Sequence, residues 1–184
     1  MNIRIDFYPM LEDWILVESI ARMTSNLPEK DTPPSDSWKR RILMARHSPI
    51  RELRFGILLV DIPTWVATHL VRHVHAQPYV SSQRNDRQGK YDRNAARQDA
   101  PVNMYWTMNA EELMIIANKR LCKKASEETR NVVKEICRQV VELCPEFSDV
   151  LVPMCVYHGG VCHEMKPCNE ERKAPMKANE TEGK

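Results

Sequence analysis

The chain has 184 residues, enough for one domain with an apolar core that needs no disulfide or metal to hold it together. Its 27 basic and 25 acidic residues leave a net charge of +2, so the overall balance gives no reason to expect binding to nucleic acid or to an anionic membrane. No apolar run approaches the roughly 18 residues that span a bilayer, and the N-terminus lacks the layout of a signal peptide. We therefore expect a cytoplasmic protein whose six cysteines are reduced thiols or metal ligands.

The N-terminal part of the chain predicts one strand followed by two helices. Residues 2–8 alternate apolar and polar side chains, as a half-buried strand does. Residues 12–22 repeat apolar side chains at helical spacing. Ser35 or Asp36 is suited to cap a second helix, which must end before Pro49.

A central strand and a long polar loop are expected next. The apolar run at residues 53–62 predicts a buried strand, and Pro63 suits the first turn of a short helix that ends near Arg72. Residues 83–103 are rich in Arg, Asn, Asp and Gln and are read as a loop. Loops of this length inside compact domains are usually functional.

Two further helices are expected to pack together in the second half. Asn109 is suited to cap the first and Ser126 to open the second. Arg120 projects from the apolar stripe of the first helix, and a buried guanidinium needs an anionic or carbonyl partner. The composition then divides the chain into a domain at residues 1–150, a Cys/His-rich segment at 151–169 and a tail at 170–184 that we expect to be disordered.

Basic residues gather in one stretch and indicate a local anion site. Between residues 72 and 97 the cations are Arg72, Arg84, Arg87, Lys90, Arg93 and Arg97, against Asp86 and Asp92. Arginine presents a planar fork of donors that suits phosphates and uracil-like carbonyls. The glycines form neither a Rossmann nor a P-loop fingerprint, so a nucleotide must be gripped by side chains and helix ends. The competing interpretation is a solvated basic loop.

Two clusters of residues resemble the flavin-dependent thymidylate synthase family. The first is His47-Ser48-Pro49, the apolar strand with Pro63, and then Arg72-His73-x-x7-Ser82-x-Arg84, where the family signature is Arg-His-Arg, seven residues and Ser. The second is Asn109-Ala110 followed by Arg120-x4-Ala125, similar to the family's downstream Asn-Ala-Arg and Arg-x4-Ala cluster. The resemblance covers residues 40 to 145 and implies an α+β fold with a mostly antiparallel central sheet flanked by helices.

The resemblance also implies roles for individual residues. The FAD-binding positions are His47, Ser48, Arg72, His73 and Asn109. The dUMP-binding positions are His69, Arg72, Ser81, Ser82, Arg84, Arg93 and Arg120. Arg120 falls on the family arginine that holds the uracil ring, favours its ionised form and makes C5 nucleophilic, which makes it the catalytic candidate.

The implied reaction converts dUMP to dTMP in a homotetramer. Methylenetetrahydrofolate donates the one-carbon unit, reduced FAD supplies the hydride, and NADPH reduces the flavin. A paralogous alternative leaves a hydroxymethyl group on dUMP or dCMP. Three departures from the family pattern bear on this choice: Val74 replaces the third signature arginine, Val80 replaces a usual Glu, and Glu111 stands where an Arg often contacts the flavin phosphate.

The C-terminal Cys/His segment carries a second possible function. Cys155, Cys162, Cys168 and His163 together offer enough thiol and imidazole ligands for tetrahedral zinc, and Gly159-Gly160 allows a tight turn between them. The spacing lacks a CxxC knuckle, so free thiols are the competing interpretation. With the basic loop, this segment also suggests a nucleic-acid or zinc-binding module as an alternative from another class. Cys122, Cys137 and Cys144 lie at helical spacings and are expected in the core.

Overall fold

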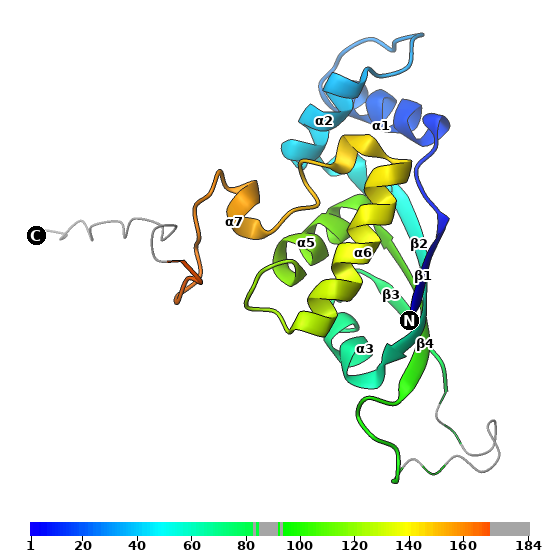
Figure 1. Cartoon of the computed structure of the whole chain (residues 1–184). Helices are drawn as coiled ribbons and strands as arrows, with labels where there is room; N and C mark the ends of the chain where they lie inside the picture. Colours follow the sequence, from blue (N-terminus) through cyan, green and yellow to red (C-terminus); the bar gives the residue numbers. More distant parts are fainter. Residues whose placement is uncertain (83, 85–91, 93, 170–184) are drawn as a thin grey trace, which may run out of the picture.

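A computed structural model describes residues 1–82, 84, 92 and 94–169, and these residues form an α+β fold around one antiparallel sheet (Figure 1). The strands are β1 (Asn2–Phe7), β2 (Arg54–Pro63), β3 (Gln77–Val80) and β4 (Pro101–Asn109), arranged in the order β1-β2-β4-β3. Each neighbouring pair is antiparallel. The expected fold class is confirmed.

Helices cover one face of this sheet and both of its ends. They are α1 (Leu11–Thr24), α2 (Asp36–Met44), the 3-10 helix η1 (Ser48–Glu52), α3 (Thr64–Leu70), α5 (Ala110–Arg120), α6 (Glu127–Leu143), the 3-10 helix η2 (Pro145–Phe147) and α7 (Met154–Tyr157). Figure 1 shows α5 and α6 side by side in front of the sheet, with α1 and α2 at one end and α3 at the other. Of the described helices, none has the length and apolar content that crossing a membrane requires.

Helix starts agree closely with the sequence. The hydroxyl of Ser35 accepts a hydrogen bond from the Trp38 amide, and the side chain of Asn109 accepts one from the Glu112 amide at 2.9 Å. Both residues therefore cap their helices as expected, because they satisfy amides that have no partner inside the helix. Ser126 likewise precedes α6. Pro63 differs from the expectation, since it ends β2 and precedes α3 instead of lying in its first turn.

The strand β4 begins inside the segment that we expected to be a loop. Val102, Met104, Trp106 and Met108 are buried along it, while the residues between them are exposed or half-buried. This is the period-2 alternation of a strand with one face on the core. Pairing with β2 on one side and β3 on the other supplies the backbone partners that a free loop would lack.

The core lies between the sheet and the helices, and a backbone hydrogen bond at its edge holds the start of α5. Phe55 of β2 meets Phe147 edge to face, with ring centroids 5.4 Å apart, and Trp14 packs on the other side of Phe147. Burying side chains of this size stabilises a fold by roughly 1.5–3 kcal/mol each. At the edge of this core, the Ala110 amide donates to the Leu53 carbonyl at 2.8 Å, which holds η1 against the first turn of α5.

Candidate functional site

Arg120 ends α5 and reaches the end of α3 and the turn that follows it. Its Nε donates to Nε2 of His73 at 3.0 Å, and its Nη2 donates to the carbonyl of His69 at 2.8 Å. The guanidinium is half-buried, so these contacts replace lost water. The expectation that this arginine needs a carbonyl or anionic partner is confirmed.

The imidazole of His73 is buried between two charged side chains. Its Nδ1 lies 3.3 Å from Oε1 of Glu112, and its side chain is 6% exposed. Burial, together with the positive charges of Arg120 and Lys119, lowers the pKa of His73 from 6.5 to about 4. His73 is therefore a neutral ring at physiological pH, and both ring nitrogens already have partners. Its predicted contact with FAD stays a prediction.

Arg72 lies close enough to Arg120 for the two charges to interact. Burial first, and then the positive charge of Arg72, lower the pKa of the Arg120 guanidinium. Neither guanidinium forms an ion pair with a carboxylate among residues 1–82, 84, 92 and 94–169. Two like charges held together in this way favour an anion between them.

The side chain of His69 faces α6. Its Nδ1 lies 3.0 Å from the hydroxyl of Thr129, and its ring meets Trp65 edge to face. The backbone of His69, through the carbonyl that holds Arg120, therefore belongs to the arginine site. Its predicted side-chain contact with dUMP stays a prediction.

The predicted phosphate-binding segment follows the edge strand β3. The Ser81 amide donates to the Asn103 carbonyl at 2.8 Å, and the Ser81 hydroxyl accepts from the Asn103 amide at 3.1 Å. The hydroxyl of Ser82 accepts from the Arg84 amide at 3.2 Å. These contacts hold the start of the segment beside β4. Arg93 lies outside the described residues, and the convergence of Arg84 with Arg120 on one nucleotide stays a prediction.

The predicted flavin-binding residues at the start of η1 are exposed. His47 precedes η1 and lines a hollow of about 370 Å³ beneath α1 and α2, and Ser48 begins the helix. Across the junction, Asn109 uses its side-chain oxygen to cap α5. Arg51 of η1 donates from Nε to Oε2 of Glu111 at 2.6 Å, so an arginine that sequence reasoning missed compensates the unusual glutamate. No sequence signal linked these two residues, because they are distant in the chain and meet only through packing of η1 on α5.

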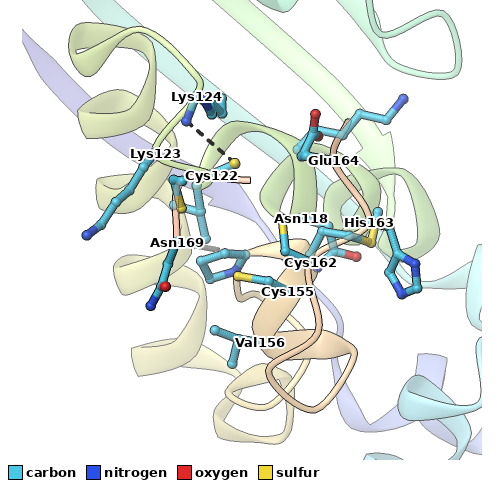
Figure 2. Close-up of a pocket in the computed structure, with 15 residues that line it drawn as sticks. Asn118, Cys122, Lys123, Lys124, Cys155, Val156, Cys162, His163, Glu164 and Asn169 are labelled. Atoms are coloured by element: carbon cyan, nitrogen blue, oxygen red, sulfur yellow. Dashed lines mark hydrogen bonds between the residues drawn. The ribbon is translucent and has the colours of Figure 1, made fainter. Parts of the chain in front are cut away.

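The Cys/His segment forms one wall of a separate pocket of about 690 Å³ (Figure 2). Cys155, Cys162, Cys168 and His163 all line it, facing the turn after α5. Nowhere in the described residues do three Cys, His, Asp or Glu side chains come close enough together to hold a metal ion. The ring of His163 packs edge to face on His158 instead, with centroids 5.1 Å apart. The predicted zinc site is therefore not formed by this structure.

The remaining cysteines divide between core and pocket. Cys137 and Cys144 are buried, and burial raises the pKa of each thiol to about 12. They are core thiols, as expected. Cys122 differs from the expectation, because it is half-buried and lines the pocket across from the Cys/His segment. Gly159 and Gly160 both have positive φ, which confirms the tight turn expected there.

The α+β fold of this chain is similar to that of three solved structures. A flavin dependent thymidylate synthase from Helicobacter pylori, solved with FAD and dUMP, superposes with a TM-score of 0.67 at 16% identity, over 82% of this chain and 99% of that one. A second structure of that enzyme gives the same TM-score at 15% identity, with coverage of 82% and 99%. A UMP/dUMP methylase from Streptomyces cacaoi bound with 5-Br dUMP gives 0.64 at 14% identity, over 82% of this chain and 96% of that one. At such identities these likenesses establish the fold.

A family model matches part of the chain. Residues 90–146 match the family model described as thymidylate synthase complementing protein. The matched stretch contains Asn109 and Arg120, the residues of the second cluster. The match covers 57 of the 184 residues, and over this stretch the expected resemblance to the flavin-dependent thymidylate synthase family is confirmed. The comparison with curated proteins gave no match.

Proposed function

We propose that this chain is a flavin-dependent thymidylate synthase that converts dUMP to dTMP as a homotetramer. The observation that carries the proposal is the pairing of Arg72 and Arg120, two neighbouring guanidiniums without carboxylate partners among the described residues. One comes from the turn after α3 and the other from the end of α5, so the fold itself assembles an anion site. The family match and the dUMP held by the Helicobacter pylori enzyme support a pyrimidine nucleotide as the anion.

Arg120 is oriented to act on the pyrimidine ring. A guanidinium has five N–H donors. Two are used, one by His73 and one by the His69 carbonyl, so three remain for a ligand. Fixed positive charge at the uracil carbonyls stabilises negative charge that develops in the ring, which makes C5 a better nucleophile. Because the donors are held before substrate arrives, little reorganisation is needed during reaction.

Residues of η1 and the start of α5 suit a flavin dinucleotide. The exposed guanidinium of Arg51 and the first residues of η1 offer cationic and hydroxyl groups for a diphosphate. Asn109 keeps its amide donors after capping α5 with its oxygen. We assign cofactor binding to His47, Ser48, Arg51, Arg72, His73 and Asn109. When bound and reduced by NADPH, FAD supplies the hydride for the reaction.

In the proposed reaction a one-carbon unit is transferred to C5 of dUMP. C5 of dUMP forms a bond to the methylene carbon of methylenetetrahydrofolate, and that carbon's bond to the folate nitrogen breaks. C5 loses its proton and tetrahydrofolate leaves, while reduced FAD, when bound, would supply the hydride that makes the transferred carbon a methyl group. In this scheme Arg72 and Arg120 hold the ring, and Ser81, Ser82, Arg84 and Arg93 hold the phosphate and sugar. The protein's contribution is orientation and electrostatic stabilisation.

A related pyrimidine reaction is the second candidate. Val74 and Glu111 depart from the family pattern at flavin positions, and the Streptomyces cacaoi neighbour is described as a methylase of UMP as well as dUMP. A hydroxymethylase acting on dUMP or dCMP uses the same ring-holding arginines but omits the hydride. Product mass distinguishes the outcomes, because a methyl and a hydroxymethyl product differ by one oxygen atom.

An absorbance spectrum of the purified protein tests the proposal. A flavoprotein is yellow, its visible band bleaches with NADPH, and the band returns when dUMP and methylenetetrahydrofolate are added together. Omitting dUMP is the control and should leave the flavin reduced under anaerobic conditions. A colourless protein that gains no flavin band when FAD is supplied, and that binds oligonucleotides with steep salt dependence, would instead support a nucleic-acid-binding module.

A further inference from the structure

Glu112 is a buried carboxylate at the start of α5. Its side chain is 4% exposed, although an isolated carboxylate is among the most costly groups to bury. The closest charged or polar side-chain partner described for it is His73, whose Nδ1 lies 3.3 Å from Oε1. No role of Glu112 follows from the family pattern or from the ligand contacts proposed above. Glu112 lies beside the His73 imidazole, which in turn contacts Arg120.

The direction of each hydrogen bond follows from Arg120. A guanidinium can only donate, so Nε2 of His73 must accept the bond from Arg120 Nε. The neutral imidazole then carries its single proton on Nδ1. The ring then presents its N–H on the side of Glu112, whose Oε1 lies 3.3 Å from Nδ1. The three side chains therefore form one polar series, with a hydrogen bond from Arg120 to His73 and a contact of 3.3 Å from His73 to Glu112.

We propose that Glu112 is a positioning residue for the proposed reaction, acting through His73 to fix the orientation of Arg120. The inference rests on the proposed function for its catalytic consequence. Glu112 and Arg120 lie eight residues apart on α5, about 12 Å along the helix axis. The imidazole from the turn after α3 bridges this gap. Without Glu112 the buried Nδ1–H faces no acceptor on that side, so the ring is free to turn and Nε2 is no longer held towards Arg120.

With an imidazole between the two charges, Arg120 keeps more N–H donors available for a ligand than it would in a direct ion pair. A carboxylate paired to arginine occupies the planar fork with two parallel bonds. Here the carboxylate's charge balances the guanidinium across the ring, and the N–H donors that His73 and the His69 carbonyl leave free stay open for a ligand. Burial raises the pKa of Glu112, and Glu111 adds to this, while His75 and Lys119 oppose it. The N-terminus of α5 also favours the carboxylate form, since Glu112 lies in the first turn of the helix.

NMR of the full-length, 15N-labelled protein without ligands directly tests the contacts from Arg120 to His73 and from His73 to Glu112. In the wild type we expect His73 Nδ1 to be protonated and Nε2 unprotonated at pH 7, with Arg120 Nε–H protected from solvent exchange. In Glu112→Leu the single tautomer is lost and Arg120 Nε–H exchanges about tenfold faster or more. Glu112→Gln keeps an acceptor oxygen and is expected to retain the tautomer. Glu111→Gln, one residue away, is the matched control and should leave the His73 signals unchanged.

Turnover supplies the second measurement. We expect kcat to fall about 100-fold in Glu112→Leu, the cost of a reacting group displaced by about 1 Å, and by about tenfold in Glu112→Gln. A wild-type His73 protonated on Nε2, or a Glu112→Leu protein with unchanged tautomer and exchange, overturns the inference. A wild type that shows the expected NMR pattern but neither binds flavin nor turns over refutes the proposed function instead, because the two readouts are independent.

Discussion

Arg51 and Glu111 join η1 to the first turn of α5 through a hydrogen bond of 2.6 Å from Nε to Oε2. By the resemblance described above, Glu111 stands where the family often has an arginine that contacts the flavin phosphate, so its charge taken alone would oppose the cofactor. The Arg51 side chain is 56% exposed and its partner 24%, which leaves other guanidinium donors open to solvent. The pair thus supplies a cation close to the expected position, from a different segment of the chain.

Replacing Arg51 by alanine is expected to weaken FAD binding about tenfold, because it removes a charge-assisted contact and leaves Glu111 uncompensated. The Tm should change little, since exposed ion pairs contribute little to stability. Titration of the apoprotein with FAD, followed by flavin fluorescence, gives the dissociation constant. Adding Glu111→Ala to the Arg51→Ala variant should recover part of the lost affinity. Equal FAD binding in all three proteins would show that this junction lies outside the cofactor site.

Arg120→Ala is expected to lower kcat by at least 10²- to 10³-fold, because it removes the fixed charge aimed at the pyrimidine ring. The fold should survive at a cost of about 1–3 kcal/mol, since His73 and the His69 carbonyl each lose a partner. Arg120→Lys keeps the charge but not the planar fork, and is expected to recover only part of the activity. Single-turnover formation of dTMP, with the unfolding midpoint in urea, separates the two effects. Unchanged turnover in Arg120→Ala would end the assignment.

Sequence patterns predicted the parts of the fold that depend on neighbours in the chain. The caps at Ser35 and Asn109 were predictable because each satisfies an amide three residues away. The strand β4 was not recognised, although Val102, Met104, Trp106 and Met108 alternate, because its first residues lie in the polar stretch 83–103 that was read as a loop.

For the candidate site, too, the sequence predicted some features and missed those that depend on tertiary packing. The need of Arg120 for a carbonyl partner could be predicted from its place on the apolar stripe of α5. The identity of that partner, the buried Glu112 behind His73 and the Arg51–Glu111 pair could not, because each depends on how segments distant in sequence pack together. Ligand spacing also suggested zinc in the Cys/His segment, but spacing does not determine whether side chains point to a common centre.

Arg84→Ala should chiefly weaken nucleotide binding and raise the dissociation constant for dUMP about tenfold or more, because a phosphate loses a charged donor. The matched control is Arg97→Ala in the same stretch of chain, since Arg97 is exposed and paired with Asp99 at 2.9 Å. Isothermal titration of each protein with dUMP provides the comparison. If Arg84→Ala binds dUMP as the wild type does, the phosphate lies elsewhere.

The stability of the protein should depend on pH through His73. The pKa of this ring is 6.5 in the unfolded chain and about 4 in the folded protein. Between pH 6.5 and pH 4, the ring is therefore protonated in the unfolded chain and neutral in the folded protein. The contribution of His73 is therefore complete above pH 6.5 and is lost as pH falls towards 4, by on the order of 3 kcal/mol. Glu112 acts in the opposite direction above its unfolded value of 4.5, because burial raises its pKa.

Urea unfolding of His73→Gln and wild type between pH 4 and 7 isolates the histidine, because Glu112 is present in both proteins. The variant is expected to lose less stability on acidification than the wild type. His163→Gln, which changes an exposed histidine, is the control and should keep the wild-type slope. Parallel curves for wild type and His73→Gln would mean that His73 is accessible to protons in the folded state.

Thiol labelling distinguishes the core cysteines from those of the pocket. Cys168 is exposed and should react with a maleimide first at pH 7.5, followed by the half-buried Cys122 and Cys155. Cys137 and Cys144, with pKa values near 12, should react on the order of 10³-fold more slowly than an ordinary thiol, and in practice only after unfolding. Peptide mass spectrometry after timed quenching gives the order, with Cys168→Ser as the control that removes the fastest site. Early labelling of Cys137 would contradict the packing of α6 against the core. Labelling in the presence of zinc is a separate test. Stoichiometric zinc that protects Cys155, Cys162 and Cys168 together would show that these thiols move to form a site on metal binding.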